Sequence, residues 1–503
     1  MPLKIAMIGA GSVGFTRRLM TDLLTVPEFG NTHFALMDIS ARNLSMVAQL
    51  CERDIKANGL PATVTSTVDR REAIADADYV ICMIRQGGLE AFALDIDIPL
   101  KYGVDQCVGD TICAGGIMYG QRTIPVLLDI CRDIRAVAKP GALFLNYSNP
   151  MAMNTWACNK YGGVQTIGLC HGVQHGHEQI AECIELRARR EGLIAEDERV
   201  TRDDVDIICA GINHQTWYVR IQWRGMDMTP RLLELFEAHP EYREEEKVRI
   251  DVLRRFGYYS TESNGHLSEY VPWYRKRPAE IGDWISLNRW ILGETGGYLR
   301  VCTEGRNWFE TDFPNWLEEE PPRISAADRS LEHGSYIIEG LETGRVYRGH
   351  FNVPNKGYIT NLPDGCVVEI PGYVDGNGVN MPVVGDLPLA CAATCSASVR
   401  VQEMAMEAAV HGDVTLLKQA MLHDPLVGAV CNPEEVWQMT DELLAEQAAW
   451  LPNYALADIE AARARLAAHE AQGTRVMLSA STGAARISTR TVEELAAEKA
   501  DAH

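Results

Sequence analysis

The first 150 residues alternate short apolar runs with helix-like segments. Apolar, β-prone runs occur at Lys4–Ile8, His33–Met37, Tyr79–Ile84 and Ala142–Leu145. Helical patterns lie between them, at Phe15–Leu24, in the segment REAIADA and at 122–137. Strands that alternate with helices favour a parallel sheet whose crossover helices cover both faces. We therefore predict an α/β fold that begins with a doubly wound parallel sheet.

The pattern becomes less regular beyond residue 170. Helix-like segments (176–191, 229–238, 245–256, 390–422) mix with strand-like runs at Gln215–Gln222 and 365–375. After Pro452 the chain forms an Ala/Glu/Arg-rich helix at 455–472, and 473–503 is polar with few core residues. No internal repeat is visible. We predict a first domain at 1–170, an α+β domain at 171–454, and a helical, partly disordered tail at 455–503.

A glycine-rich turn follows the first predicted strand. Gly9, Gly11 and Gly14 form a complete GxGxxG, with Ser12 inside it, and Asp38 ends the next strand 24 residues after Gly14. The first glycine allows a tight turn, the second lets the backbone approach a pyrophosphate, and the third lets the helix pack closely on the strand. A carboxylate at position 38 can bind ribose hydroxyls and would repel a 2′-phosphate. The sequence therefore predicts a Rossmann-type site for NAD rather than NADP.

The composition of the chain mainly excludes certain partners and protein classes. With 46% apolar and 23% charged residues the chain is typical of a soluble globular protein. A formal net charge of −22 argues against nucleic acid and anionic membranes as partners. No secretory signal and no membrane-spanning apolar segment is expected. The fourteen cysteines show no paired CxxC zinc pattern, so reduced thiols in the cytoplasm are expected.

Four polar segments each follow a strand-like run. They are Val108–Thr111, Asn146–Pro150, Cys170–Val173 and Gly211–His214. In open α/β sheets, ligands bind beyond the carboxyl ends of the strands, so these segments are expected to form a site. Taken alone, each residue also has an ordinary structural explanation, such as a buried cysteine, a satisfied histidine or an Asn-Pro turn.

In these segments the chain resembles glycoside hydrolase family 4, and within it the galactosidase branch. The resemblance extends from residue 4 to about 454 and includes KIAMIGAGSVGF, LNYSNPMAMNTWA, IGLCHGVQ, CAGINHQTWY and FGYYSTESNGHLSEYVPW. It implies a lactate/malate dehydrogenase-like fold and hydrolysis that requires NAD. It also implies a divalent metal, usually manganese, bound by Cys170 and His214.

The resemblance further implies a reaction by transient oxidation. A hydride leaves sugar carbon 3, a base removes the proton on carbon 2, the group on carbon 1 is eliminated, and water and the hydride then return. Asn149 and Asn213 are expected to bind substrate, and Asn146 to contact the cofactor. For acid and base roles we consider His171, Asp110 and Tyr259. A binding role for His171, a turn role for Asp110 and a core role for Tyr259 remain open.

The substrate implied is an α-galactoside, with α-galacturonides, α-glucuronides and α-glucosides of the same family as alternatives. The basic run Arg275–Arg277 could bind a uronate carboxylate, but a solvated cluster is the preferred interpretation. His175 and His177 are interpreted as surface residues. A homodimer or homotetramer is expected. A lactate/malate-type dehydrogenase is the rival enzyme, and a non-catalytic NAD sensor is the remaining alternative.

Overall fold

The computed structural model describes residues 2–287, 293–476, 483 and 486–501. Its strands form a single mixed sheet, and the strands of its N-terminal half are parallel, in the order β3-β2-β1-β4-β5-β6. This is the strand order of a Rossmann sheet, so the predicted fold class is confirmed. The parallel strands are β1 (Lys4–Ile8), β2 (His33–Met37), β3 (Thr63–Thr67), β4 (Tyr79–Cys82), β5 (Leu143–Asn146) and β6 (Thr166–Gly168).

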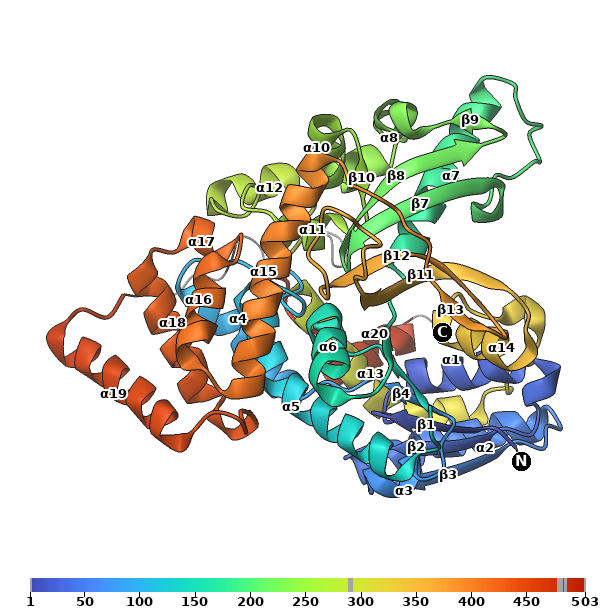
Figure 1. Cartoon of the computed structure of the whole chain (residues 1–503), viewed down its shortest axis with the longest axis horizontal. Coiled ribbons are helices and arrows are strands. Elements are labelled where there is room, and N and C mark those ends of the chain that lie inside the picture. The colour runs from blue at the N-terminus through green and yellow to red at the C-terminus, as the bar shows by residue number, and fades with distance from the viewer. Residues whose placement is uncertain (1, 288–292, 477–482, 484–485, 502–503) are drawn as a thin grey trace.

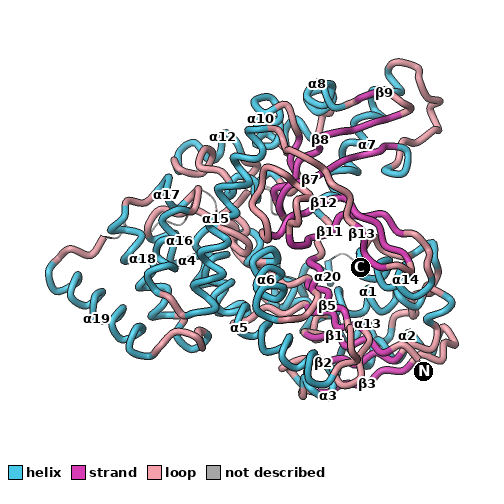
Figure 2. The backbone as a smooth tube through the Cα atoms, in the orientation of Figure 1, coloured by secondary structure: helices cyan, strands magenta, loops and turns pink. Residues whose placement is uncertain are grey.

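An antiparallel half continues the same sheet. β11 pairs with the last parallel strand through Asn352 and Gly168, and β12 pairs with β7 through Glu369 and Gly211. Figure 2 shows the resulting band of strands running from β3 through the middle of the molecule to β8. The strands of this half are β7 (Val205–Ile212), β8 (Gln215–Trp223), β9 (Met226–Asp227), β10 (Tyr259–Ser260), β11 (Tyr347–Pro354), β12 (Val367–Asp375) and β13 (Gly378–Asn380).

Helices cover the parallel half and build a separate layer at one side (Figure 1). In the first half they are α1 (Val13–Leu24), α2 (Ala41–Ala57), α3 (Arg70–Ile74), α4 (Gly88–Lys101), α5 (Cys113–Val137), α6 (Met151–Ala157) and α7 (Gly172–Arg190). The middle of the chain adds α8 (Leu232–Ala238), α9 (Tyr242–Glu245), α10 (Lys247–Phe256), α11 (Asn264–Tyr270), α12 (Ile281–Trp284), α13 (Gly297–Glu318) and α14 (His333–Thr343). The last are α15 (Leu389–His411), α16 (Val414–His423), α17 (Val427–Val430), α18 (Pro433–Glu446), α19 (Leu456–Gln472) and α20 (Val492–Asp501).

Helix α5 and strand β3 are two of the elements in the parallel half that differ from the prediction. Helix α5 begins at Cys113, well before the expected residue 122, and its first turns are buried. Its early glycines allow this, because a Cβ on Gly115 would lie 2.4 Å from the backbone oxygen of Gly109, and a Cβ on Gly116 would lie 2.4 Å from the backbone of Thr111. Strand β3 was not predicted, because an edge strand with exposed Thr and Ser carries little hydrophobic signal.

The described part of the C-terminal tail packs against helices of the body. α19 packs against α18, and α20 packs against α13 far away in the sequence. Arg490 forms an ion pair with Glu304 on that helix at 2.7 Å, and Arg486 reaches Asp97 on α4 at 2.6 Å. The described part of the tail is therefore docked on the body of the protein. No helix in the described ranges combines the length and apolar character needed to cross a bilayer.

Candidate active site

The glycine-rich loop has the backbone geometry that its sequence predicts. Gly9 has a φ of +88°, and a Cβ built on it would lie 2.8 Å from the backbone oxygen of Met83. A Cβ on Gly11 would lie 2.8 Å from the Asp38 carboxylate, which accepts a hydrogen bond of 2.8 Å from the Gly11 amide. Asp38 is thus held at the end of β2 beside the loop, where a carboxylate can meet ribose hydroxyls.

Three other residues are predicted to contact the cofactor, and they differ in exposure: Ser12 and Gly14 are exposed, and Asn146 is buried. Ser12 is the N-cap of α1, and it is exposed with no side-chain capping bond, so its hydroxyl is available to a ligand. Gly14 is exposed, and a Cβ on it would meet no atom within 4 Å. The prediction that a glycine is needed here for close packing of the helix on the strand is therefore wrong. Asn146 is fully buried, and its side chain accepts a hydrogen bond from the amide of Ser148. Its side chain shapes the turn after β5, and its contact with the cofactor stays a prediction.

A cavity of about 500 Å³ lies at the carboxyl ends of the strands. All four polar segments contribute to it, which confirms that they form one site. Two aromatic side chains of the wall, Phe15 and Tyr147, stack edge to face at 4.8 Å. The residues that line the cavity are Phe15, Val108, Asp110, Tyr147, Asn149, Leu169, Cys170, His171, His175, His214, Glu262, Ser263, His266 and Tyr298.

Three potential metal ligands converge in this cavity. Cys170 Sγ lies 3.2 Å from His214 Nε2, and Glu262 Oε1 lies 3.9 Å from the sulfur and 3.6 Å from the imidazole nitrogen. They are the one group of three or more His, Cys, Asp or Glu ligand atoms clustered tightly enough for a metal in the described residues. Sulfur, imidazole nitrogen and carboxylate oxygen together suit a divalent transition metal.

The electrostatics of the cluster also suit a cation. Burial lowers the pKa of His214 to about 4, so its ring is neutral and able to ligate. Burial alone would raise the pKa of Glu262, but the surrounding histidines outweigh it and lower that pKa to about 2. Burial raises the pKa of the Cys170 thiol well above its usual range. Because a metal binds the thiolate, we expect metal affinity to rise with pH.

A chain of hydrogen bonds fixes the tautomer of His214. Its Nδ1 lies 2.8 Å from His266 Nε2, and His266 Nδ1 lies 2.9 Å from a carboxylate oxygen of Glu269. That carboxylate accepts hydrogen bonds from backbone amides, including that of Val108 at 2.8 Å. With the proton of each ring on Nδ1, His214 donates to His266, His266 donates to Glu269, and Nε2 of His214 is left bare toward Cys170. This is the arrangement that orients a metal-binding imidazole.

Asp110 is a buried acceptor at the edge of the cavity. It accepts hydrogen bonds from Thr111 Oγ1 at 2.8 Å and from Asn149 Nδ2 at 3.0 Å, and Arg85 lies 3.3 Å away. The Arg85 guanidinium itself lies over the ring of Tyr298 at 5.4 Å. The structure therefore places the predicted pair Asp110 and Asn149 in direct contact and holds both toward the cavity.

His171 stands at the more open side of the cavity. Its Nδ1 lies 3.7 Å from a carboxylate oxygen of Glu332, and its ring centre lies 4.8 Å from that of His175. Partial desolvation lowers its pKa, so the neutral ring is favoured near pH 7. His175 is exposed, as predicted, and it also lines the cavity beside His171.

Tyr259 and Asn213 do not reach the cavity. Tyr259 stacks on Phe236 with ring centres 4.1 Å apart, and its hydroxyl donates to Gln179. Its expected role as the base is therefore wrong, since β10 turns it into the core beneath α7. Asn213 is fully buried behind His214, with Nδ2 at 3.4 Å from Glu369, so the side chain is not positioned to bind substrate.

The basic run is not a solvated cluster throughout. Arg275 is fully buried, and it binds Asp105 at 2.6 Å and donates to the backbone oxygen of Gly293. Lys276 and Arg277 are exposed. None of the three lines the cavity, so the run offers no site for a uronate carboxylate.

Models of one enzyme family match most of the chain. The family 4 glycosyl hydrolase model matches residues 4–186, and the family 4 glycosyl hydrolase C-terminal domain matches residues 209–427.

The chain belongs to glycosyl hydrolase family 4.

Enzymes of this family depend on NAD, unlike glycosidases that use two carboxylates. This accounts for a dinucleotide loop and a sugar-sized cavity in one chain.

Individual relatives cover nearly the whole chain. An alpha-galactosidase from Rhizobium meliloti is 59% identical over 99% of this chain and 97% of its own length. An alpha-galactosidase from Bacillus subtilis is 34% identical over 90% of this chain and 99% of its own. Among solved structures, a putative glucosidase from Bacillus subtilis is 27% identical with a TM-score of 0.74, covering 88% of this chain and 99% of its own.

Sequence reasoning missed the roles of several cavity residues. Glu262 and His266 lie in the segment FGYYSTESNGHLSEYVPW, from which the sequence analysis assigns a role only to Tyr259. A helix start in the sequence is a signal that could have identified both residues. Ser263 caps α11 by accepting a hydrogen bond from the His266 amide, so Glu262 and His266 lie on either side of the start of this helix. Arg85 and Tyr298 gave no signal, because they lie far apart in the sequence and meet only in the fold.

Proposed function

We propose that this family 4 enzyme hydrolyses α-galactosides with NAD and a divalent metal, manganese being the first choice. The observation that carries the proposal is the convergence of Cys170, His214 and Glu262 in the cavity that also holds Asp110 and Asn149. The 59% identical relative, named alpha-galactosidase, supports the substrate. The buried position of Arg275 removes the basic run as support for a uronide substrate.

The residues present fit both groups. Cys170, His214 and Glu262 would hold the metal, and the Gly9–Gly14 loop with Asp38 would hold the dinucleotide. When bound, NAD supplies a hydride acceptor, and the metal stabilises negative charge on sugar oxygens.

The chain's own side chains then bind the sugar and move protons. Asp110 can accept from a ring hydroxyl, and Asn149 beside it fixes the direction of that carboxylate. His171 is assigned the transfer of a proton to the oxygen of the departing group; burial lowers its pKa, so the protonated ring, which the Glu332 carboxylate 3.7 Å away stabilises, is the minor form near pH 7. Asp110 is buried, and its removal from water strengthens its contacts.

Assays with nitrophenyl α-galactoside and α-galacturonide test the substrate and the chemistry together. With NAD, manganese and a thiol reductant we expect the galactoside to be cleaved without net formation of NADH. Omission of NAD or addition of a chelator should abolish cleavage. Cleavage that persists without NAD would overturn the proposed chemistry, and cleavage of the uronide alone would overturn the proposed substrate.

The Cys170→Ala variant tests the metal site directly. It removes the thiolate ligand, so we expect a loss of manganese affinity of at least roughly a hundredfold and a matching loss of activity at low metal. Cys302→Ala is the matched control, because Cys302 is the other half-buried cysteine and is not part of the ligand cluster. Equal manganese affinity of wild type and Cys170→Ala would contradict the assignment.

We further infer a homodimer or homotetramer in the cytoplasm. All fourteen cysteines are free, and a thiol ligand needs a reducing environment to stay reduced. Light scattering on the purified protein measures the oligomeric state. Oxidant-treated protein should lose activity and recover it with reductant, and activity that withstands oxidation would argue against Cys170 as a ligand.

A further inference from the structure

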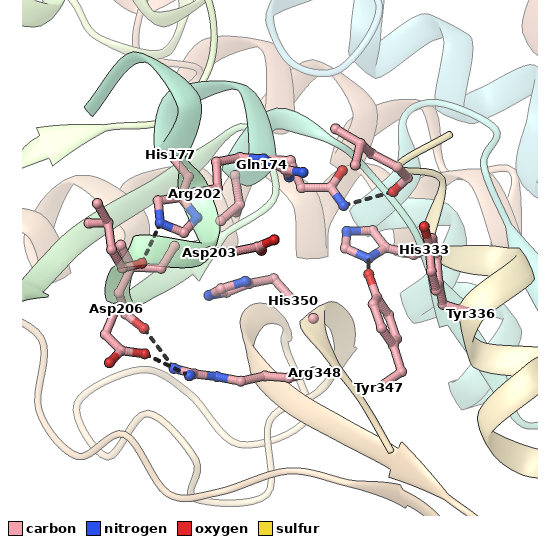
Figure 3. A pocket seen from close by; sticks show the side chains of 15 residues that line it. Gln174, His177, Arg202, Asp203, Asp206, His333, Tyr336, Tyr347, Arg348 and His350 are labelled. Atoms are coloured by element: carbon pink, nitrogen blue, oxygen red, sulfur yellow. Dashed lines mark hydrogen bonds and ion pairs between the residues drawn. The ribbon is translucent and has the colours of Figure 1, made fainter. Parts of the chain in front are cut away.

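A second cavity of about 490 Å³ lies behind the first turns of α7 (Figure 3). Its wall is built from α7, α14, β11 and the turn that precedes β7, and it shares no lining residue with the active-site cavity. Helix α7 separates the two, since His171 and His175 line the active site while Gln174 and His177 line the second cavity. A volume of this size accommodates a monosaccharide.

Buried polar atoms in this wall lack partners. His333 is 1% exposed and His350 is 8% exposed, and Nε2 of each has no hydrogen-bond partner in the described part of the chain. Oε1 of Gln174 is likewise buried and unpaired, while its Nε2 donates to the backbone oxygen of Leu331. Buried polar groups are normally satisfied, so three such atoms around one cavity point to a ligand that supplies their partners.

The protonation of the histidines can be worked out from their contacts. Burial lowers the pKa of His333 to about 3, so its ring carries one proton. Its Nδ1 lies 2.6 Å from the Tyr347 hydroxyl. When that hydroxyl donates, the proton of the ring lies on Nε2, which becomes a donor. His350 is also kept neutral, because burial lowers its pKa to about 3, and Figure 3 shows its ring in the middle of the cavity.

Positively and negatively charged side chains also line the second cavity. Arg348 is neutralised by Asp206 at 3.1 Å, but Arg202 is half-buried and has no ion pair in the described residues. Arg202 and the two imidazoles can therefore bind an oxyanion. Gln174 Oε1 and the Asp203 carboxylate can accept from hydroxyl groups.

We propose that this cavity is a second ligand site, distinct from the active site, for a sugar that bears a phosphate or carboxylate group. The anionic group would bind Arg202, His333 and His350, and the hydroxyls would bind Gln174 and Asp203. A neutral sugar would leave the cation unpaired, and a simple anion would leave the acceptors unpaired.

Titration calorimetry on the full chain tests this, with glucose 6-phosphate, galacturonate, galactose and inorganic phosphate as separate probes. We expect an anionic sugar to bind more tightly than galactose or phosphate, and the first two probes show which anionic group is preferred. Arg202→Gln should weaken that binding roughly tenfold or more, because it removes a charge-assisted contact. Arg199→Gln, a nearby exposed arginine paired with Glu185, should leave binding unchanged.

Two further variants decide between sites. His350→Gln should also weaken the binding, whereas Asp110→Asn in the active site should not. The proposal is overturned if neither anionic sugar binds, or if Asp110→Asn abolishes binding while Arg202→Gln does not. It is also overturned if Arg202→Gln changes the oligomeric state instead of binding, because the cavity would then be an interface between copies of this chain.

Discussion

His214 and Glu262 both have left-handed backbone conformations, with φ of +62° and +73°, although neither is glycine. Such conformations cost about 1–3 kcal/mol each and persist where the surroundings enforce them. In both cases the conformation turns a ligand atom toward Cys170. Backbone strain and ligand geometry thus coincide at the same two residues, which supports the metal site independently of the distances.

His266 is expected to position His214 rather than to bind metal. A His266→Leu variant removes the nearer of two possible acceptors for the His214 Nδ1 proton, the other being Thr111 Oγ1 at 3.1 Å, so manganese affinity should fall roughly 10–100-fold. Electron paramagnetic resonance titration of free manganese measures this without reference to activity. His423→Leu, at an exposed site at the end of α16, is the control. Unchanged affinity in His266→Leu would show that the hydrogen-bond chain has no role in metal binding.

Glu369 should make the metal-free protein less stable as pH rises. Burial raises the pKa of its carboxyl from 4.5 to about 8, so the folded state keeps a proton that the unfolded state has lost. The free energy of unfolding should therefore fall between pH 4.5 and 8, by on the order of 5 kcal/mol at most.

Glu369→Gln removes this dependence. Urea unfolding of both proteins at pH 5 and pH 8 should show a smaller loss of stability with pH in the variant. The same loss in both proteins would mean that Glu369 is ionised in the folded state.

At the scale of elements, glycines decide how closely segments approach the site. Gly115 and Gly116 let the first turns of α5 pack against the Gly109–Thr111 segment, which fixes the direction of Asp110. The glycine-rich loop works similarly at Gly9, where both the positive φ and the nearby Met83 backbone exclude a side chain. Not every glycine of the loop is constrained in this way.

Gly9→Ala and Gly14→Ala should therefore have opposite effects on stability. The first introduces a clash and backbone strain, so thermal unfolding should show a loss of about 1–3 kcal/mol or more. The second places a methyl group in open space near the start of α1 and should be neutral or slightly stabilising. A similar loss in both variants would contradict the geometry of the loop.

At the scale of the whole molecule, the active-site cavity lies where the two halves of the sheet meet. Asp110, Asn149 and Cys170 come from the parallel half, while His214 and Glu262 follow antiparallel strands. The metal cluster exists only because β11 and β12 join β6 to β7 in one sheet. The tail adds a second long-range contact, with α20 against α13, the helix that carries Tyr298.

Truncation after residue 472 should destabilise the enzyme. It removes the contacts of α20 with α13 and the ion pairs of Arg475 and Arg490, so we expect a lower melting temperature and weaker substrate binding at the Tyr298 side of the cavity. Calorimetry and KM measurements check this. If neither changes, the docked tail has no part in the site.

The sequence alone determined the dinucleotide half and the identity of most site segments. The Gly9–Gly14 loop, Asp38 and the apolar strands are local patterns, and local patterns follow from backbone sterics and side-chain periodicity. Cys170, His214, Asp110 and Asn149 were likewise recognisable, because each stands in a short segment with a family resemblance.

Only the tertiary structure decided which side chains face the cavity. Strand residues alternate between faces, so the neighbours Tyr258, Tyr259 and Ser260 could not be assigned to core or cavity from their order alone. Tyr259 and Asn213 proved to be fully buried outside the cavity, and His175 proved to line it. The third metal ligand and the second cavity depend on contacts between segments far apart in the chain, and no local pattern encodes such contacts.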